Sequence, residues 1–231
     1  MTHDQEGKTS HPRTISLIVT ILAHIFLLVP VIYIIAVYSD TYSFFSWHPI
    51  CMAIGAGLLI NEGIFVISGE ANLTNRLSRA NRITTHWILN TCGLTLVFIG
   101  LIIIIVHKNN IGRSHFQTTH GQLGLSSIVI ACVIASGGIL ANNTRWFYPR
   151  IRPIYIKVGH ALGGIAMMIL FIATIINGTY KYHFPGGYTG RTIIFVFLFF
   201  AAVIILFKPI IGAISRVSVI LKPSQPAQSS S

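Results

Sequence analysis

Residues 83–106, ITTHWILNTCGLTLVFIGLIIIIV, form a stretch of 24 residues without a charged side chain. About 20 consecutive apolar residues in a helix cross the hydrocarbon core of a bilayer, so this stretch predicts a membrane-spanning helix. Five further apolar runs lie on either side of it, at 15–37, 48–68, 120–141, 155–177 and 192–207. The connections are short, which makes consecutive helices antiparallel neighbours. The sequence therefore predicts an all-α fold, a bundle of six transmembrane helices.

The composition supports a membrane protein and excludes most soluble folds. Of the 231 residues, 53% are hydrophobic and only 9% are charged. Sixteen Lys and Arg side chains stand against five acidic ones, a balance that also occurs in nucleic-acid-binding proteins. Here, however, the basic residues lie between the apolar runs rather than on a soluble face. We therefore expect membrane lipid as a partner and no nucleic acid.

The distribution of positive charge predicts the orientation. Twelve Lys and Arg residues lie on the side of both termini, and four lie on the other side: Lys108, Arg113, Lys181 and Arg191. Cytoplasmic segments are the ones enriched in Lys and Arg, so we expect both termini in the cytoplasm. We divide the chain into a cytoplasmic tail at 1–14, a transmembrane domain at 15–213 and a disordered cytoplasmic tail at 214–231.

Four histidines occupy the first turns of the middle four predicted helices. His48 and His120 begin helices on the outer side, and His86 and His160 begin helices on the inner side. The two levels are separated by about 20–25 Å at the helical rise per residue. A lone His in a membrane helix usually donates a hydrogen bond to a neighbouring carbonyl, but intramembrane ionisable groups are costly and mostly functional.

This pairing favours haem over zinc. A zinc site needs three or four converging ligands, whereas two opposed imidazoles are the axial ligands of a b-type haem. The three cysteines form no CxxCH motif, so haem would be bound non-covalently. We predict two haem b groups held by the middle four helices. Glycines follow the histidines at same-face spacings and indicate either space for a porphyrin or close helix packing: Gly55, Gly93, Gly100, Gly124 and Gly164.

Four motifs resemble those of the cytochrome b561 family, and in particular its short transmembrane reductases. They are FSWHP at 45–49, RxxxHW at 82–87, THGQLG at 119–124 and GHALGG at 159–164. The resemblance covers about residues 15–215. It implies that His48 and His120 bind a non-cytoplasmic haem and that His86 and His160 bind a cytoplasmic one. It also implies single-electron transfer from cytosolic ascorbate to monodehydroascorbate radical or a ferric chelate, in endoplasmic reticulum or endomembrane vesicles.

The resemblance also suggests substrate residues at both ends. His107 matches a family position at the outer substrate pocket, and Lys108 and Arg113 beside it would attract an anion. At the cytoplasmic end, basic side chains would attract ascorbate: Arg79, Arg82, Arg150, Arg152 and Lys157. Each of these charges is also explained by the general enrichment of Lys and Arg in cytoplasmic segments. Ascorbate-using members tend to carry basic residues where this chain has Ser68 and Ile83, which leaves the donor open.

Glu62 is the one acidic residue well inside a predicted span. A carboxyl group there is either protonated or paired, and the resemblance places it near the cytoplasmic haem. We expect His24, in the first helix, to be a hydrogen-bonded packing residue. The alternative function is a six-helix transporter of protons or transition metals with a histidine relay, which predicts broken helices and charges at the midplane. A homodimer is one possible assembly.

Overall fold

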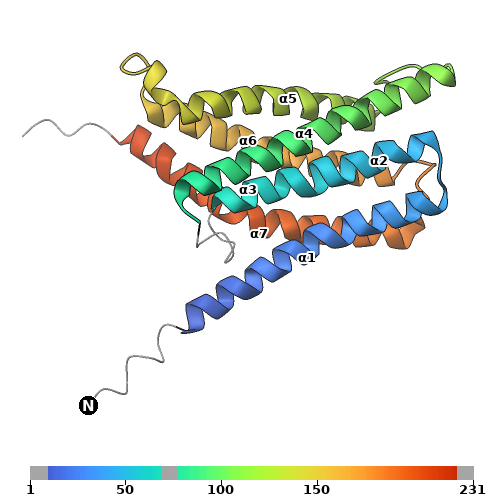
Figure 1. Ribbon diagram of the computed structural model, residues 1–231, viewed down its shortest axis with the longest axis horizontal. Coiled ribbons are helices and arrows are strands. Elements are labelled where there is room, and N and C mark those ends of the chain that lie inside the picture. The colour runs from blue at the N-terminus through green and yellow to red at the C-terminus, as the bar shows by residue number, and fades with distance from the viewer. Residues whose placement is uncertain (1–9, 69–76, 223–231) are drawn as a thin grey trace, which may run out of the picture.

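The computed structural model describes residues 10–68 and 77–222, with side chains from residue 14 onward (Figure 1). Six helical spans in these ranges are long and apolar enough to cross a membrane, which confirms the predicted fold class. They are Thr14–Asp40, Phe44–Ser68, Arg79–Asn110, Thr119–Asn142, Pro153–Thr179 and Gly187–Leu221.

The spans alternate in direction, so Figure 1 shows the first described residues of α1 and the last of α7 at the same end of the bundle. The elements in chain order are α1 (Ser10–Asp40), η1 (Phe44–Ser46), α2 (Trp47–Met52), η2 (Ala53–Leu59), α3 (Ile60–Ser68), α4 (Arg79–Asn110), α5 (Thr119–Asn142), η3 (Thr144–Trp146), α6 (Pro153–Thr179) and α7 (Gly187–Leu221).

The second span is continuous but changes its helical type along its length. Between α2 and α3 the segment η2 is a π-helix, and the backbone N–H of Ile60 donates to the carbonyl of Gly55, five residues earlier. Asn61 is fully buried, and its Nδ2 donates to the carbonyls of Ala56 at 3.2 Å and Gly57 at 2.8 Å. The side-chain amide therefore satisfies carbonyls that the wider turn shifts out of α-helical register.

The helices pack in groups. The second span packs against α4, α5 packs against α6, and α1 packs against α7, which also contacts α6 (Figure 1). Within the described ranges, α4 makes little close backbone contact with α5 or α6. The backbone of α4 is therefore set apart from the α5–α6 pair. The first half of α1 leans away from the other helices (Figure 1).

The last helix continues beyond residue 213, the predicted end of the transmembrane domain. Helix α7 continues to Leu221, so residues 214–221, which were predicted to be disordered, are helical. Apolar residues recur through this segment up to Leu221, and Pro209 lies inside the helix without ending it. Lys8 and Arg76 lie outside the described residues, as do residues 1–9 and 223–231 of the tails predicted at 1–14 and 214–231.

Candidate functional site

The four predicted histidines meet as two pairs. The imidazole centroids of His48 and His120 are 6.2 Å apart with an interplanar angle of 88°. Those of His86 and His160 are 6.3 Å apart at 82°. His48 comes from α2 and faces His120 on α5, whereas His86 comes from α4 and faces His160 on α6. The pairs therefore bridge the interface at which the helix backbones are not in close contact.

Backbone carbonyls orient three of the four rings. Nδ1 of His48 donates to the Gly100 carbonyl at 2.9 Å, Nδ1 of His86 to the Gly63 carbonyl at 2.8 Å, and Nδ1 of His120 to the Thr174 carbonyl at 3.1 Å. Because a carbonyl only accepts, Nδ1 carries the proton, and Nε2 of each neutral ring keeps its lone pair. A ring held in this way through one nitrogen is the usual arrangement of a metal-binding histidine.

The ring of His160 is held differently. Its Nδ1 is buried and lacks a hydrogen-bond partner. Gly138 of α5 provides the space for this ring, since a Cβ at position 138 would lie 3.2 Å from His160 Cε1. Gly178 does the same for His120, with a Cβ position 3.1 Å from Cε1. Both contacts show that small residues set the positions of the rings.

Each pair has the donor set and spacing of a bis-imidazole iron site. A metal–imidazole bond is about 2 Å long, so one metal between two facing nitrogens places the ring centroids a little over 6 Å apart. The observed separations agree with this value. No group of three His, Cys, Asp or Glu side chains that could hold a metal ion occurs in the described ranges. The residues present fit a haem at each pair.

The same-face glycines divide into two groups. A Cβ at Gly164 would meet no atom within 4 Å, and one at Gly124 would meet only Thr174 Cγ2 at 3.5 Å, so both leave open space beside a histidine. A Cβ at Gly55 would lie 2.6 Å from the Gly93 carbonyl oxygen, and one at Gly93 would lie 2.8 Å from Ile60 Cγ1. These two glycines allow the second span to pack closely on α4.

Gly100 belongs to the packing group too. A Cβ there would lie 3.2 Å from Met52 Cε and 3.3 Å from Cys51 Cβ. The interpretation of the glycines as space for a porphyrin is therefore wrong for Gly55, Gly93 and Gly100.

A cavity of about 1030 Å³ surrounds the His48–His120 pair. Gly124 and Gly178 line it near the rings, and the predicted outer residues line its mouth: His107, Lys108 and Arg113. The ring of Phe45 lies between two of the imidazoles, 5.2 Å from His107 and 6.0 Å from His48 by their centroids. Lys108 Nζ donates to the Ser114 carbonyl at 2.9 Å, which holds its charge at the mouth.

The mouth also contains residues that sequence reasoning missed. His115, Lys181 and His183 line the same cavity, and of these only Lys181 contributed to the sequence prediction, as one of the four basic residues of the outer side. These residues come from two different loops. Their only sequence signal is that both loops were predicted to lie on the side of His48 and His120.

The predicted donor residues lie at the opposite end, near the His86–His160 pair. Arg79, Arg152 and Lys157 are exposed, and Arg82 is half-buried with its Nε shielded and unpartnered. Arg82 lies one turn before His86 on the same face of α4. Lys157 likewise lies three residues before His160 on α6, so Arg82 and Lys157 are both about one turn from the pair.

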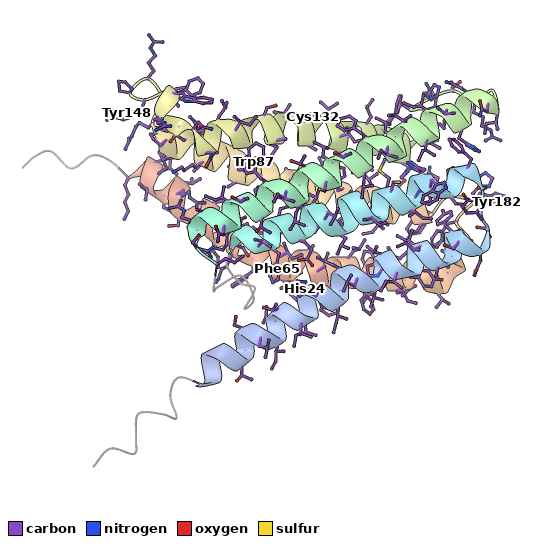
Figure 2. The ribbon with its side chains drawn as sticks, viewed as in Figure 1. His24, Phe65, Trp87, Cys132, Tyr148 and Tyr182 are labelled. Atoms are coloured by element: carbon purple, nitrogen blue, oxygen red, sulfur yellow. The ribbon has the colours of Figure 1, made fainter. Side chains whose placement is uncertain are left out.

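Glu62 is paired, as predicted for a carboxyl group inside a span. His24 Nδ1 lies 2.7 Å from Glu62 Oε1, with side chains 33% and 16% exposed. The His24 ring also packs edge-on against Phe65, at 5.8 Å between centroids, and Figure 2 shows these two residues side by side on α1 and α3. The prediction that His24 is a hydrogen-bonded packing residue is confirmed.

Comparison with known protein families matches residues 47–185 to the eukaryotic cytochrome b561 family. The chain belongs to this family. The match contains all four paired histidines and nearly the whole cavity lining, whereas α1 and His24 lie outside it. Membership implies a haem b cofactor.

The names of curated proteins similar to this cytochrome b561 all describe reductases. The chain is 34% identical over 152 residues to human "Transmembrane reductase CYB561D2", covering 64% of this chain and 66% of that protein. It is 29% identical over 174 residues to mouse "Probable transmembrane reductase CYB561D1", covering 74% of each. It is 25% identical over 151 residues to mouse "Lysosomal membrane ascorbate-dependent ferrireductase CYB561A3", covering 61% and 57%. The match thus spans just under two thirds of the human protein.

Proposed function

We propose that this cytochrome b561 is a transmembrane reductase that passes single electrons from cytosolic ascorbate to an acceptor on the other side of the membrane. The acceptor is monodehydroascorbate radical or a ferric chelate, and the membrane is that of the endoplasmic reticulum or an endomembrane vesicle. The observation that carries this proposal is the presence of two imidazole pairs at two depths of one bundle. The relatives named as transmembrane and ascorbate-dependent reductases support the same reaction class.

The histidines have the role of cofactor ligands. His48 and His120 would hold one haem b, and His86 and His160 would hold the other. When bound, a b-type haem supplies reversible one-electron chemistry at its iron. Backbone carbonyls accept the Nδ1–H of His48, His86 and His120, which leaves Nε2 of each neutral ring available to iron.

The two levels are separated by a distance that the helix itself gives. His48 donates to the Gly100 carbonyl on α4, and Gly100 lies 14 residues after His86 on the same helix. The separation along α4 is therefore about 21 Å. Two redox centres at these levels divide a bilayer of about 30 Å into short steps.

Charge at the two ends supports the direction of transfer. Among the side chains that the structure describes, nine Lys or Arg lie at the His86–His160 end and four at the other end, which favours a cytoplasmic location for the former. Arg79, Arg82, Arg152 and Lys157 would attract ascorbate there. His107, Lys108 and Arg113 would receive an anionic acceptor at the cavity mouth, together with Lys181. The continuous spans give no support to the alternative of a transporter with broken helices.

Haem content and spectrum test the proposal. The purified protein should contain two haem equivalents per chain with the absorption of low-spin bis-His haem, and ascorbate should reduce it. His86→Ala should remove one equivalent and slow reduction by ascorbate, while the His48–His120 site stays loaded. His115→Ala, at the cavity mouth, should retain both equivalents. A colourless protein, or two equivalents in His86→Ala, would contradict the proposal.

Vesicles containing the protein test the acceptor. Vesicles loaded with a ferric chelate and given external ascorbate should form ferrous iron inside, and vesicles without protein should not. If only a trapped source of monodehydroascorbate radical is consumed, that radical is the acceptor.

A further inference from the structure

We propose that His24 and Glu62 form a proton-binding site whose occupancy is linked to the presence of an electron at the His86–His160 pair. The inference rests on the proposed function. It starts from the contact between His24 Nδ1 and Glu62 Oε1 at 2.7 Å, which joins α1 to α3 inside the membrane-spanning part of the bundle. A carboxyl group and an imidazole in hydrogen-bond contact readily hold one proton between them.

The backbone of α3 connects this site to the ligand histidine. Glu62 precedes Gly63, and the Gly63 carbonyl accepts the Nδ1 proton of His86 at 2.8 Å. Helix α1, which carries His24, contacts the second span, and α4, which carries His86, packs along α3. The two sites thus lie at one level of the bundle, separated by about the diameter of a helix, or roughly 10 Å.

The charged groups near Glu62 determine how the pair can bind a proton. Within the described ranges, His24 is the one group that forms an ion pair with Glu62, and Asp40, at the far end of α1, is the one other carboxylate. Elements packed against α1 and α3 carry other charged or titratable groups at this end: Arg79, Arg82, His86 and Cys92 on α4, Tyr155, Lys157 and His160 on α6, and Lys208 and Arg216 on α7.

Electrostatics then couples the site to the electron. With one shared proton the pair is neutral, and loss of that proton leaves a carboxylate in a medium that solvates it poorly. One extra negative charge about 10 Å away, at an effective dielectric constant of about 20, strengthens proton binding by roughly tenfold. The pair therefore binds its proton more tightly while the electron is present.

Ascorbate, the proposed donor, supplies both the electron and the proton. One-electron oxidation of ascorbate monoanion gives the ascorbyl radical anion, one electron and one proton. Where the pair has lost its proton, it takes up one as the electron arrives at the His86–His160 level. It returns that proton to the same aqueous side when the electron leaves. The overall reaction is unchanged by this uptake and release. The pair compensates the charge of the electron and is not a catalytic residue.

Redox titration over a range of pH tests the inference in the purified, haem-loaded chain. In the unchanged protein, one of the two potentials should fall as pH rises through the titration of the pair, by about 59 mV in total for a tenfold change in proton affinity. Glu62→Gln and His24→Gln each keep a hydrogen bond but leave only one titratable group of the pair, so each should shift the pH interval over which that potential changes. Asp40→Asn, the matched loss of a carboxylate, should leave the dependence intact.

An infrared difference spectrum between the reduced and oxidised forms gives a second readout. A carboxyl band should be present in the unchanged protein and absent in Glu62→Gln. Two bound haems with the same pH dependence in both glutamine variants, or a carboxyl band that persists in Glu62→Gln, would overturn the inference and leave the proposed function standing. A chain that binds no haem would overturn both.

Discussion

Gly164 offers a sharp test of where the cofactor lies. It is four residues after His160 on the same helical face, and a Cβ built there meets no protein atom within 4 Å. One helical turn is about 5.4 Å, so this open space lies beside the proposed ring plane, within the half-width of a porphyrin. We predict that Gly164→Leu fills space that belongs to the cofactor of the His86–His160 pair.

We expect Gly164→Leu to leave the haem-free protein at least as stable as before but to weaken the binding of haem. In the helix, replacement of Gly by Leu is favourable by roughly 0.5–1 kcal/mol, so the haem-free protein should unfold no more easily than before. At the site, overpacking costs about 1–3 kcal/mol. Since 1.4 kcal/mol is a factor of ten, haem binding at this pair should weaken by about tenfold to a hundredfold.

The assay combines haem titration with thermal unfolding. Haem is added to the haem-free chain in detergent, the two binding phases are followed by absorbance, and unfolding is followed by circular dichroism. Gly159→Leu is the matched control, because it lies on the same helix, is exposed and also has no atom within 4 Å of its Cβ position. Unweakened binding in Gly164→Leu, or equal weakening in Gly159→Leu, would refute the assignment of this space to the cofactor.

Two further predictions concern helix packing and the cavity mouth. Gly55→Ala places a Cβ 2.6 Å from the Gly93 carbonyl oxygen, so it should lower the free energy of unfolding by about 1–3 kcal/mol, measured by thermal unfolding of the haem-free chain; an unchanged transition would show that α4 can move away freely. Lys108→Gln and Lys181→Gln should each lower kcat/KM for an anionic ferric chelate by about two- to fivefold, with a weaker dependence on salt, whereas Lys222→Gln at the opposite end should not. Equal effects of all three lysine variants would indicate a general surface charge instead.

The sequence predicted the parts of the fold and site that depend on local pattern. The length and apolar character of each run predict a membrane span, and the alternating direction of six spans places His48 with His120 and His86 with His160. The structure brings both pairs to just over 6 Å between ring centroids. These features could be read from the chain because helical rise and hydrophobic length are properties of a single segment.

Contacts between segments could be decided only by the tertiary structure. The sequence predicted that Glu62 needs a partner, but it could not name His24, which lies 38 residues away on another helix. Nor could it separate Gly164, which lies beside open space, from Gly55, which lies against the backbone of α4. Both glycines follow a histidine at the same kind of spacing. The difference between them depends on where two helices approach each other, and side chains distant in sequence determine that approach by filling the volume between the helices.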